Sequence, residues 1–187
     1  NLPNTLELRK FESEERQNRR ISINLTKIIE HMPKKAHPMD VARTAVSVMA
    51  LEDKETSDNS PEANMRKAMR IFAKVPTVLG AFYRIRKGKK ILKPKKDLTF
   101  SENIFYLFFG KVPQKEIVKA LDVSLILYAE HGFNVSTFTA RTITSSLSDM
   151  HGAVTGAIAS LKGPLHGGAN EKVMELMNKI KTPKKAE

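Results

Sequence analysis

The stretch that decides the fold is PQKEIVKALDVSLILYAEH, residues 113–131. Its apolar side chains recur every three or four positions, at Ile117, Leu121, Leu125 and Tyr128. This spacing places them on one face of an α-helix, whereas a strand would alternate apolar and polar residues. The stretch therefore predicts one long amphipathic helix.

Similar patterns flank this helix on both sides. We expect further helices over residues 5–20, 21–31, 37–49, 60–85, 101–109, 137–148, 150–161 and 170–181. Pro76 interrupts one of them, so residues 60–85 form either two abutting helices or one kinked helix. Gly152, Gly156 and Ser160 recur every four residues and should let another helix approach closely. No useful strand pattern occurs, so the predicted class is all-α and multi-helical.

Composition narrows the functional classes. The chain has 187 residues, a net charge of +12 and no cysteine. This length suits one domain or most of one. The lack of cysteine excludes disulfides, zinc–thiolate sites and thiol catalysis. The N-terminus does not resemble a signal peptide, and no run of about 20 apolar residues occurs, so we expect a cytoplasmic protein.

The basic residues cluster in one segment. Eight of them fall within residues 84–96, which Gly88 and Pro94 should keep as a surface loop: Arg84, Arg86, Lys87, Lys89, Lys90, Lys93, Lys95 and Lys96. Such a loop is consistent with a solvated surface, or with a non-catalytic basic helical module that binds anionic partners such as nucleic acid. Both interpretations stay open at this point.

The most informative histidine is His166, in the sequence KGPLHGGANE at residues 162–171. Gly167 and Gly168 can let a ligand approach the backbone, and Asn170 can cap the helix that follows. A histidine at a helix N-terminus favours its neutral form, which can donate a hydrogen bond to a carbonyl and stabilise an enolate. The alternative is a glycine-rich turn with an incidental histidine.

A second polar corner lies at residues 128–137, YAEHGFNVST. Gly132 should end the long helix, and Ser136 or Thr137 could cap the next one. His131 and Asn134 either belong to a plain helical corner or face a cleft. The remaining histidines, His31, His37 and His151, fit structural roles, and no histidine has a metal-ligand partner at the usual spacing.

Taken together, these motifs resemble the citrate synthase family. GPLHGGAN at 163–170 resembles its active-site histidine motif, and EHGFNVST at 130–137 resembles its oxaloacetate-binding motif. The resemblance extends through SLSDM at 146–150, GAI at 156–158, and HPMD at 37–40 with Arg43-Thr44. The stretch 133–141 is most similar to 2-methylcitrate synthases and their relatives.

The resemblance implies a Claisen condensation. Acetyl-CoA or propionyl-CoA is enolised, the enol attacks oxaloacetate, and thioester hydrolysis yields citrate or 2-methylcitrate and free CoA. It implies that His166 is catalytic and stabilises the enol, and that His131 binds oxaloacetate. It also implies a homodimer, with no nucleic acid, membrane, metal or bound cofactor involved, since acyl-CoA is a co-substrate. The choice between acetyl-CoA and propionyl-CoA stays open.

The chain also departs from the family pattern. Family members are about twice as long, and their later motifs supply a second histidine, the catalytic aspartate and the arginines that bind the substrate carboxylates. We therefore expect residues 1–163 to be part of the large helical domain. Residues 164–187 should form the active-site histidine loop and the start of a connection to a small domain. Without that aspartate and those arginines, the chain alone should be inactive.

Overall fold

The computed structural model describes residues 2–129, 132–180 and 182, and these contain helices but no strand. The predicted all-α class is confirmed. The helices are α1 (Thr5–Asn18), α2 (Ile23–His31), α3 (Pro38–Glu52), α4 (Pro61–Arg86), α5 (Phe100–Phe109), α6 (Lys115–Ala129), α7 (Val135–Thr144), α8 (Met150–Leu161) and α9 (Gly168–Ile180). None of these helices combines the length and apolar character that crossing a membrane would require, as far as the described residues extend.

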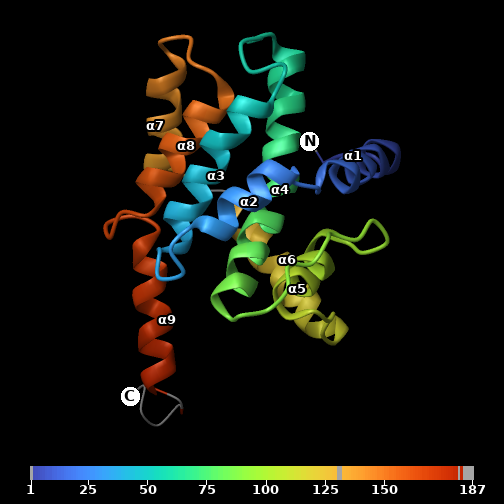
Figure 1. The fold of residues 1–187 in the computed structure, drawn as a ribbon, viewed down its shortest axis with the longest axis vertical. Helices are drawn as coiled ribbons and strands as arrows, with labels where there is room; N and C mark the ends of the chain where they lie inside the picture. Colours follow the sequence, from blue (N-terminus) through green and yellow to red (C-terminus); the bar gives the residue numbers. More distant parts are fainter. Residues whose placement is uncertain (1, 130–131, 181, 183–187) are drawn as a thin grey trace.

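The long helix α4 lies at the centre of the fold, and α1, α2, α3, α5 and α8 pack against it (Figure 1). The core sits where α2, α3 and α4 meet. Its buried side chains are Leu25, Ile29, Val41, Ala45, Met49, Val78 and Phe82. The helical spacing of these residues in the sequence is therefore explained by burial on facing sides of three helices.

Helix α4 continues through Pro76 as one helix. Proline removes a backbone hydrogen bond and normally kinks or ends a helix. Here Ala73, Thr77 and Val78 are buried on both sides of the proline. Packing of these neighbours holds the two halves together, which decides between the two alternatives that the sequence left open. The basic segment is correspondingly shorter than predicted, because Arg84 and Arg86 belong to α4.

The N-caps of α5 and α7 differ from the prediction. Helix α5 is capped by Thr99, and not by Ser101. Thr99 and Glu102 exchange side-chain and backbone hydrogen bonds in a capping box, which satisfies two donors where a cap at Ser101 would satisfy fewer. Ser101 is buried and contacts Asp122 of α6 instead. Helix α7 is capped by Asn134, and not by Ser136 or Thr137.

Helices α7 and α8 pack closely against each other and α8 packs on α3. The close approach depends on Gly156, because a Cβ atom there would lie 2.3 Å from Cδ1 of Ile143. At the next turn Thr139 Oγ1 and Ser160 Oγ lie 2.6 Å apart. The predicted close approach of another helix is confirmed at Gly156 and Ser160, whereas a Cβ atom at Gly152 would meet only Ser148 and Asp149 at the start of its own helix.

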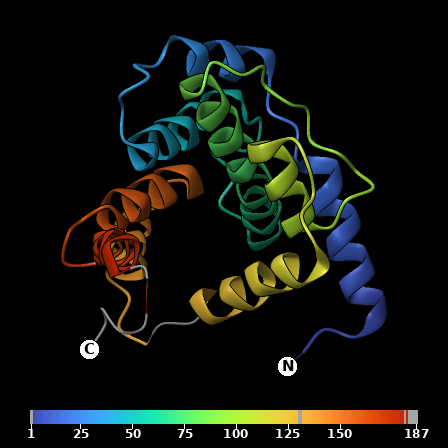
Figure 2. The same ribbon diagram turned by 90° about the horizontal axis from the view of Figure 1, so that it is seen from below.

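Helix α6 forms where the opening stretch predicted it, but its apolar face is not covered. None of its residues is buried. Figure 2 shows α6 as a bar along the edge of the molecule, with α7, α8 and α9 beyond its far end. Ile126 and Leu127 are exposed by 71% and 73%, which is unusual for adjacent large apolar residues.

Candidate active site

His166 lies in the tight turn between α8 and α9. The carbonyl of Gly163 accepts hydrogen bonds from the backbone N–H groups of His166 (2.9 Å) and Gly168 (3.1 Å). Gly167 is needed because a Cβ atom there would lie 2.4 Å from the carbonyl oxygen of Leu161. Gly167 therefore allows two parts of the backbone to approach closely within the turn, whereas the sequence suggested that it makes room for a ligand.

The two predicted motifs meet at one contact. Nε2 of the half-buried His166 lies 2.9 Å from Oγ of Ser136, in the first turn of α7. Ser136 was predicted as a cap, and its contact with His166 was missed. The only signal for Ser136 in the sequence was its place within the 130–137 motif. The contact itself depends on the crossing of α7 and α8, which brings the two residues together.

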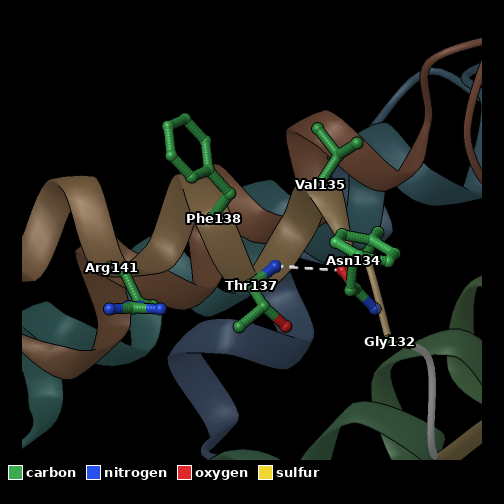
Figure 3. A pocket seen from close by; sticks show the side chains of 7 residues that line it. Gly132, Asn134, Val135, Thr137, Phe138 and Arg141 are labelled. Carbon is green, nitrogen blue, oxygen red and sulfur yellow. Dashed lines mark hydrogen bonds between the residues drawn. The ribbon is translucent and has the colours of Figure 1, made fainter.

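His131, the predicted substrate-binding residue, lies outside the described residues. The corner beside it can be described from Gly132 onward. Asn134 Oδ1 accepts a hydrogen bond from the N–H of Thr137 at 3.0 Å, which starts α7 (Figure 3). A pocket of about 480 Å³ opens here, with mostly apolar lining: Gly132, Phe133, Asn134, Val135, Thr137, Phe138 and Arg141. Asn134 therefore fits both interpretations of this corner, because it lines the pocket and its side-chain amide oxygen caps α7.

Helix α9 begins two residues earlier than predicted. It starts at Gly168, so Asn170 lies in its first turn and does not cap it. Glu171, also in this turn, contacts His37. Beyond this root α9 extends away from the other helices (Figure 1).

A second polar cluster lies where α3, α4 and α8 meet. Arg70 forms a two-bond ion pair with Asp53, at 2.9 Å for each bond. His151 is buried beside it, with Nε2 3.5 Å from Asp53 Oδ2. Burial lowers the pKa of His151, and burial likewise lowers the pKa of Lys74 on the rim. The cluster borders a pocket of about 430 Å³, and its charges largely balance one another.

Two of the cations predicted for the basic surface make contacts within the chain, Arg84 as a buried residue and Lys95 as an exposed one. The guanidinium of Arg84 donates to the backbone carbonyls of Lys90 and Phe108. The ammonium of Lys95 lies 4.7 Å from the ring centroid of Tyr106. Some of the basic side chains therefore have structural roles, which weakens the interpretation of the basic segment as part of a nucleic-acid-binding module. Within the described part of the chain, no group of three or more histidine, aspartate and glutamate side chains could hold a metal ion.

The comparisons with known proteins match the whole chain. The family model described as citrate synthase, C-terminal domain, covers residues 1–187. A 2-methylcitrate synthase from Mycobacterium tuberculosis is 45% identical over 99% of this chain, which corresponds to 47% of that protein. A citrate synthase from Deinococcus radiodurans is also 45% identical, over 100% of this chain and 49% of that protein.

A solved structure agrees with this similarity. The citrate synthase of the thermophilic archaeon Thermoplasma acidophilum, determined with carboxymethyl coenzyme A and oxaloacetate, has a TM-score of 0.89 and 29% sequence identity. The match covers 98% of this chain and 48% of that one. The chain therefore spans about half the length of the relatives it matches. Because the family model matches from the first residue to the last, the chain belongs to the citrate synthase family.

Proposed function

We propose that this protein condenses acetyl-CoA or propionyl-CoA with oxaloacetate, giving citrate or 2-methylcitrate and free CoA. The observation that carries the proposal is the contact between Ser136 and His166, which joins the two motifs in a chain that matches the family throughout. Relatives at 45% identity bear both names, citrate synthase and 2-methylcitrate synthase. We leave the acyl chain open, because one methylene is worth only about 1–3 kcal/mol of discrimination.

His166 acts on the acyl thioester in this proposal. With the hydroxyl of Ser136 donating to Nε2, a neutral ring carries its proton on Nδ1, and this N–H donates to the thioester oxygen. A base takes a proton from the carbon next to the thioester, and the hydrogen bond stabilises the enolate. That carbon then forms a bond to the keto carbon of oxaloacetate, whose C=O π bond opens, and the resulting alkoxide takes up a proton to become the hydroxyl group of the product. Water then adds to the thioester carbonyl and the C–S bond breaks, which leaves a carboxylate and releases the CoA thiol. His131 binds oxaloacetate.

The test follows the His166 ring directly. Oxaloacetate and carboxymethyl coenzyme A are added to the purified 187-residue chain while the imidazole ¹⁵N shifts are recorded. We expect saturable shifts at His166 that are absent with His166→Gln and retained with His31→Gln, a histidine at the end of α2 whose ring contacts the backbone carbonyl of Lys27. Shifts at other histidines with the His166 ring unmoved would contradict the proposal.

Turnover is a separate expectation. The family resemblance assigns the base and the carboxylate-binding arginines to motifs that follow the histidine loop, so the 187 residues alone should release no CoA. A thiol reagent measures this release without background, because the chain has no cysteine. CoA release above the uncatalysed rate would show that the base lies within these residues. On the same reasoning we propose residues 1–163 as large domain and 164–187 as the start of the connection.

We also propose a symmetric homodimer. Support comes from the uncovered apolar side chains of α6 and α7, including Ile126, Leu127 and Phe138, which are exposed by 71%, 73% and 72%. Such side chains are enriched where subunits pack together. Sedimentation equilibrium should give twice the chain mass of 21.0 kDa, and Leu127→Asp should reduce the mass to that of one chain. A monomer at every concentration of the unmodified chain would reject the dimer.

A further inference from the structure

The sequence HPMD at residues 37–40 has no part in the proposed chemistry, yet two of its side chains reach the turn that carries His166. His37 Nε2 lies 2.9 Å from Oε1 of Glu171, five residues after His166. Asp40 Oδ2 lies 2.6 Å from Nζ of Lys162, four residues before it. The start of α3 therefore contacts the turn on both sides of His166.

The ring of His37 is held in one tautomer when neutral. Its Nδ1 accepts a hydrogen bond from the backbone N–H of Met39 at 3.2 Å and so caps α3. The proton of the neutral ring then resides on Nε2, where it is donated to Glu171. Pro38 follows at the first position of the helix and fixes the backbone there. His37 thus caps α3 and contacts the first turn of α9 through Glu171.

The second contact, between Lys162 and Asp40, lies at the C-terminal end of α8. Lys162 is the C-cap of α8, and its side chain and that of Asp40 are exposed by 37% and 31%. The hydrogen bond from Lys162 lowers the pKa of Asp40, and Arg43 lies 3.0 Å from the other carboxylate oxygen. The Asp40 carboxylate therefore stays charged, and its contact with Arg43 links its side chain to the next turn of α3.

The turn between these two contacts has little freedom of its own. Gly163, next to Lys162, accepts the backbone hydrogen bonds of His166 and Gly168. A displacement of Lys162 or of Glu171 is therefore passed to the His166 ring and to its contact with Ser136. This matters because α9 extends away from the other helices (Figure 1).

We propose that His37 and Asp40 are positioning residues for His166, acting through Glu171 and Lys162. The assignment rests on the proposed function, because it gives the orientation of that ring its purpose. A ring held within a fraction of an ångström is what stabilisation of a developing enolate requires.

The experiment compares two glutamates of α9 in the intact chain. Glu171→Ala removes the contact with His37, while Glu175→Ala makes the same change on the same helix at a residue that pairs only locally with Lys172. We expect Glu171→Ala to shift the ¹⁵N resonances of His166 and to speed amide hydrogen exchange at residues 163–169 by about fivefold, the size of one net hydrogen bond. Glu171→Gln, which keeps the acceptor oxygen, should restore both. Glu175→Ala should change neither.

The other contact has its own matched pair. Lys162→Met keeps the length of the side chain but loses the charge, and should act like Glu171→Ala, whereas Lys162→Arg should behave like the unmodified chain. If Glu171→Ala and Lys162→Met lower the unfolding midpoint but leave the His166 resonances in place, the contacts are merely stabilising and the proposal is wrong. Equal effects of Glu171→Ala and Glu175→Ala would also overturn it.

These readouts do not depend on a bound substrate. If the His166 resonances shift in the variants, but oxaloacetate and carboxymethyl coenzyme A move other histidines of the unmodified chain and not His166, the positioning contacts stand and the proposed chemistry fails. If ligands bind but the variants leave the ring unaffected, only the positioning role fails. The two failures are therefore distinguishable.

Discussion

Ser136 and His166 show what single residues contribute here. The sequence predicts His166 as a candidate from its local surroundings of glycine and proline, and this required no tertiary information. Ser136 could not be identified in the same way, because its contact with His166 spans 30 residues and depends on how α7 crosses α8. A local motif can be recognised from the sequence, but a contact that helix packing creates between distant residues cannot.

Ser136→Ala removes the hydroxyl that contacts Nε2 of His166. We expect the His166 ¹⁵N resonances to shift, and the free energy of unfolding to fall by about 1 kcal/mol, the usual net value of one hydrogen bond. Ser136→Thr keeps the hydroxyl and is the control. Identical ring resonances in Ser136→Ala and the unmodified chain would show that the contact is absent in solution.

His151 makes stability depend on pH. Burial lowers its pKa, and the neighbouring Lys67 and Arg70 lower it further, while Asp53 and Asp149 oppose this shift. The unfolded chain therefore takes up a proton at the ordinary histidine pKa near 6.5, where the folded protein does not. Above that pH the ring is neutral in both states and does not reduce the free energy of unfolding. As the pH falls below it, protonation of His151 in the unfolded chain lowers the free energy of unfolding. Urea unfolding between pH 7.5 and 5.5 should show a smaller loss in His151→Gln, and an equal loss in both proteins would contradict this.

At the scale of helices, the sequence predicted which segments are helical better than it predicted where each helix begins and ends. The opening stretch and the pattern around Ser60-Pro61 located α6 and the start of α4. Caps decided the rest: α5 starts one residue after Thr99 because the Glu102 pairing satisfies more donors than Ser101 could. Such competition between adjacent candidates depends on side-chain geometry, which the order of residues does not express.

The contact between α7 and α8 can be tested with a double-mutant cycle. Gly156→Ala should destabilise by about 1–2 kcal/mol, because its Cβ would overlap Cδ1 of Ile143, although alanine is normally the better helix former. Ile143→Val removes that Cδ1 atom. The alanine should therefore cost less in the Ile143→Val background when unfolding is measured by denaturant. Additive effects would place the strain elsewhere.

At the scale of the whole molecule, Arg19 ties distant segments together. Its guanidinium, 1% exposed, pairs with Glu15 at 2.6 Å and donates to the carbonyls of Lys95 (2.6 Å) and Leu98 (2.9 Å). Thr77 of α4 donates to the backbone carbonyl of Arg19. This network could not be predicted from the sequence, because Arg19 is one of many charged residues within residues 5–20.

Arg19→Met should lower the free energy of unfolding by about 3–5 kcal/mol, because Glu15 remains buried without its partner. Arg16→Met provides the comparison on the same helix. Arg16 pairs with Glu12 at 3.5 Å near the surface, so its loss should cost less than about 1 kcal/mol. Similar costs for the two variants would mean that the Arg19 network is not formed.

The same arginine has a consequence for proteolysis. The segment from Lys87 to Lys96 offers trypsin more adjacent cleavage sites than any other stretch of the chain, yet its backbone is fastened by Arg84 at Lys90 and by Arg19 at Lys95. A protease must draw its substrate out of the fold, and bonded backbone resists this. Trypsin should therefore spare this lysine-rich segment in the native chain and cut it early once Arg19 is replaced.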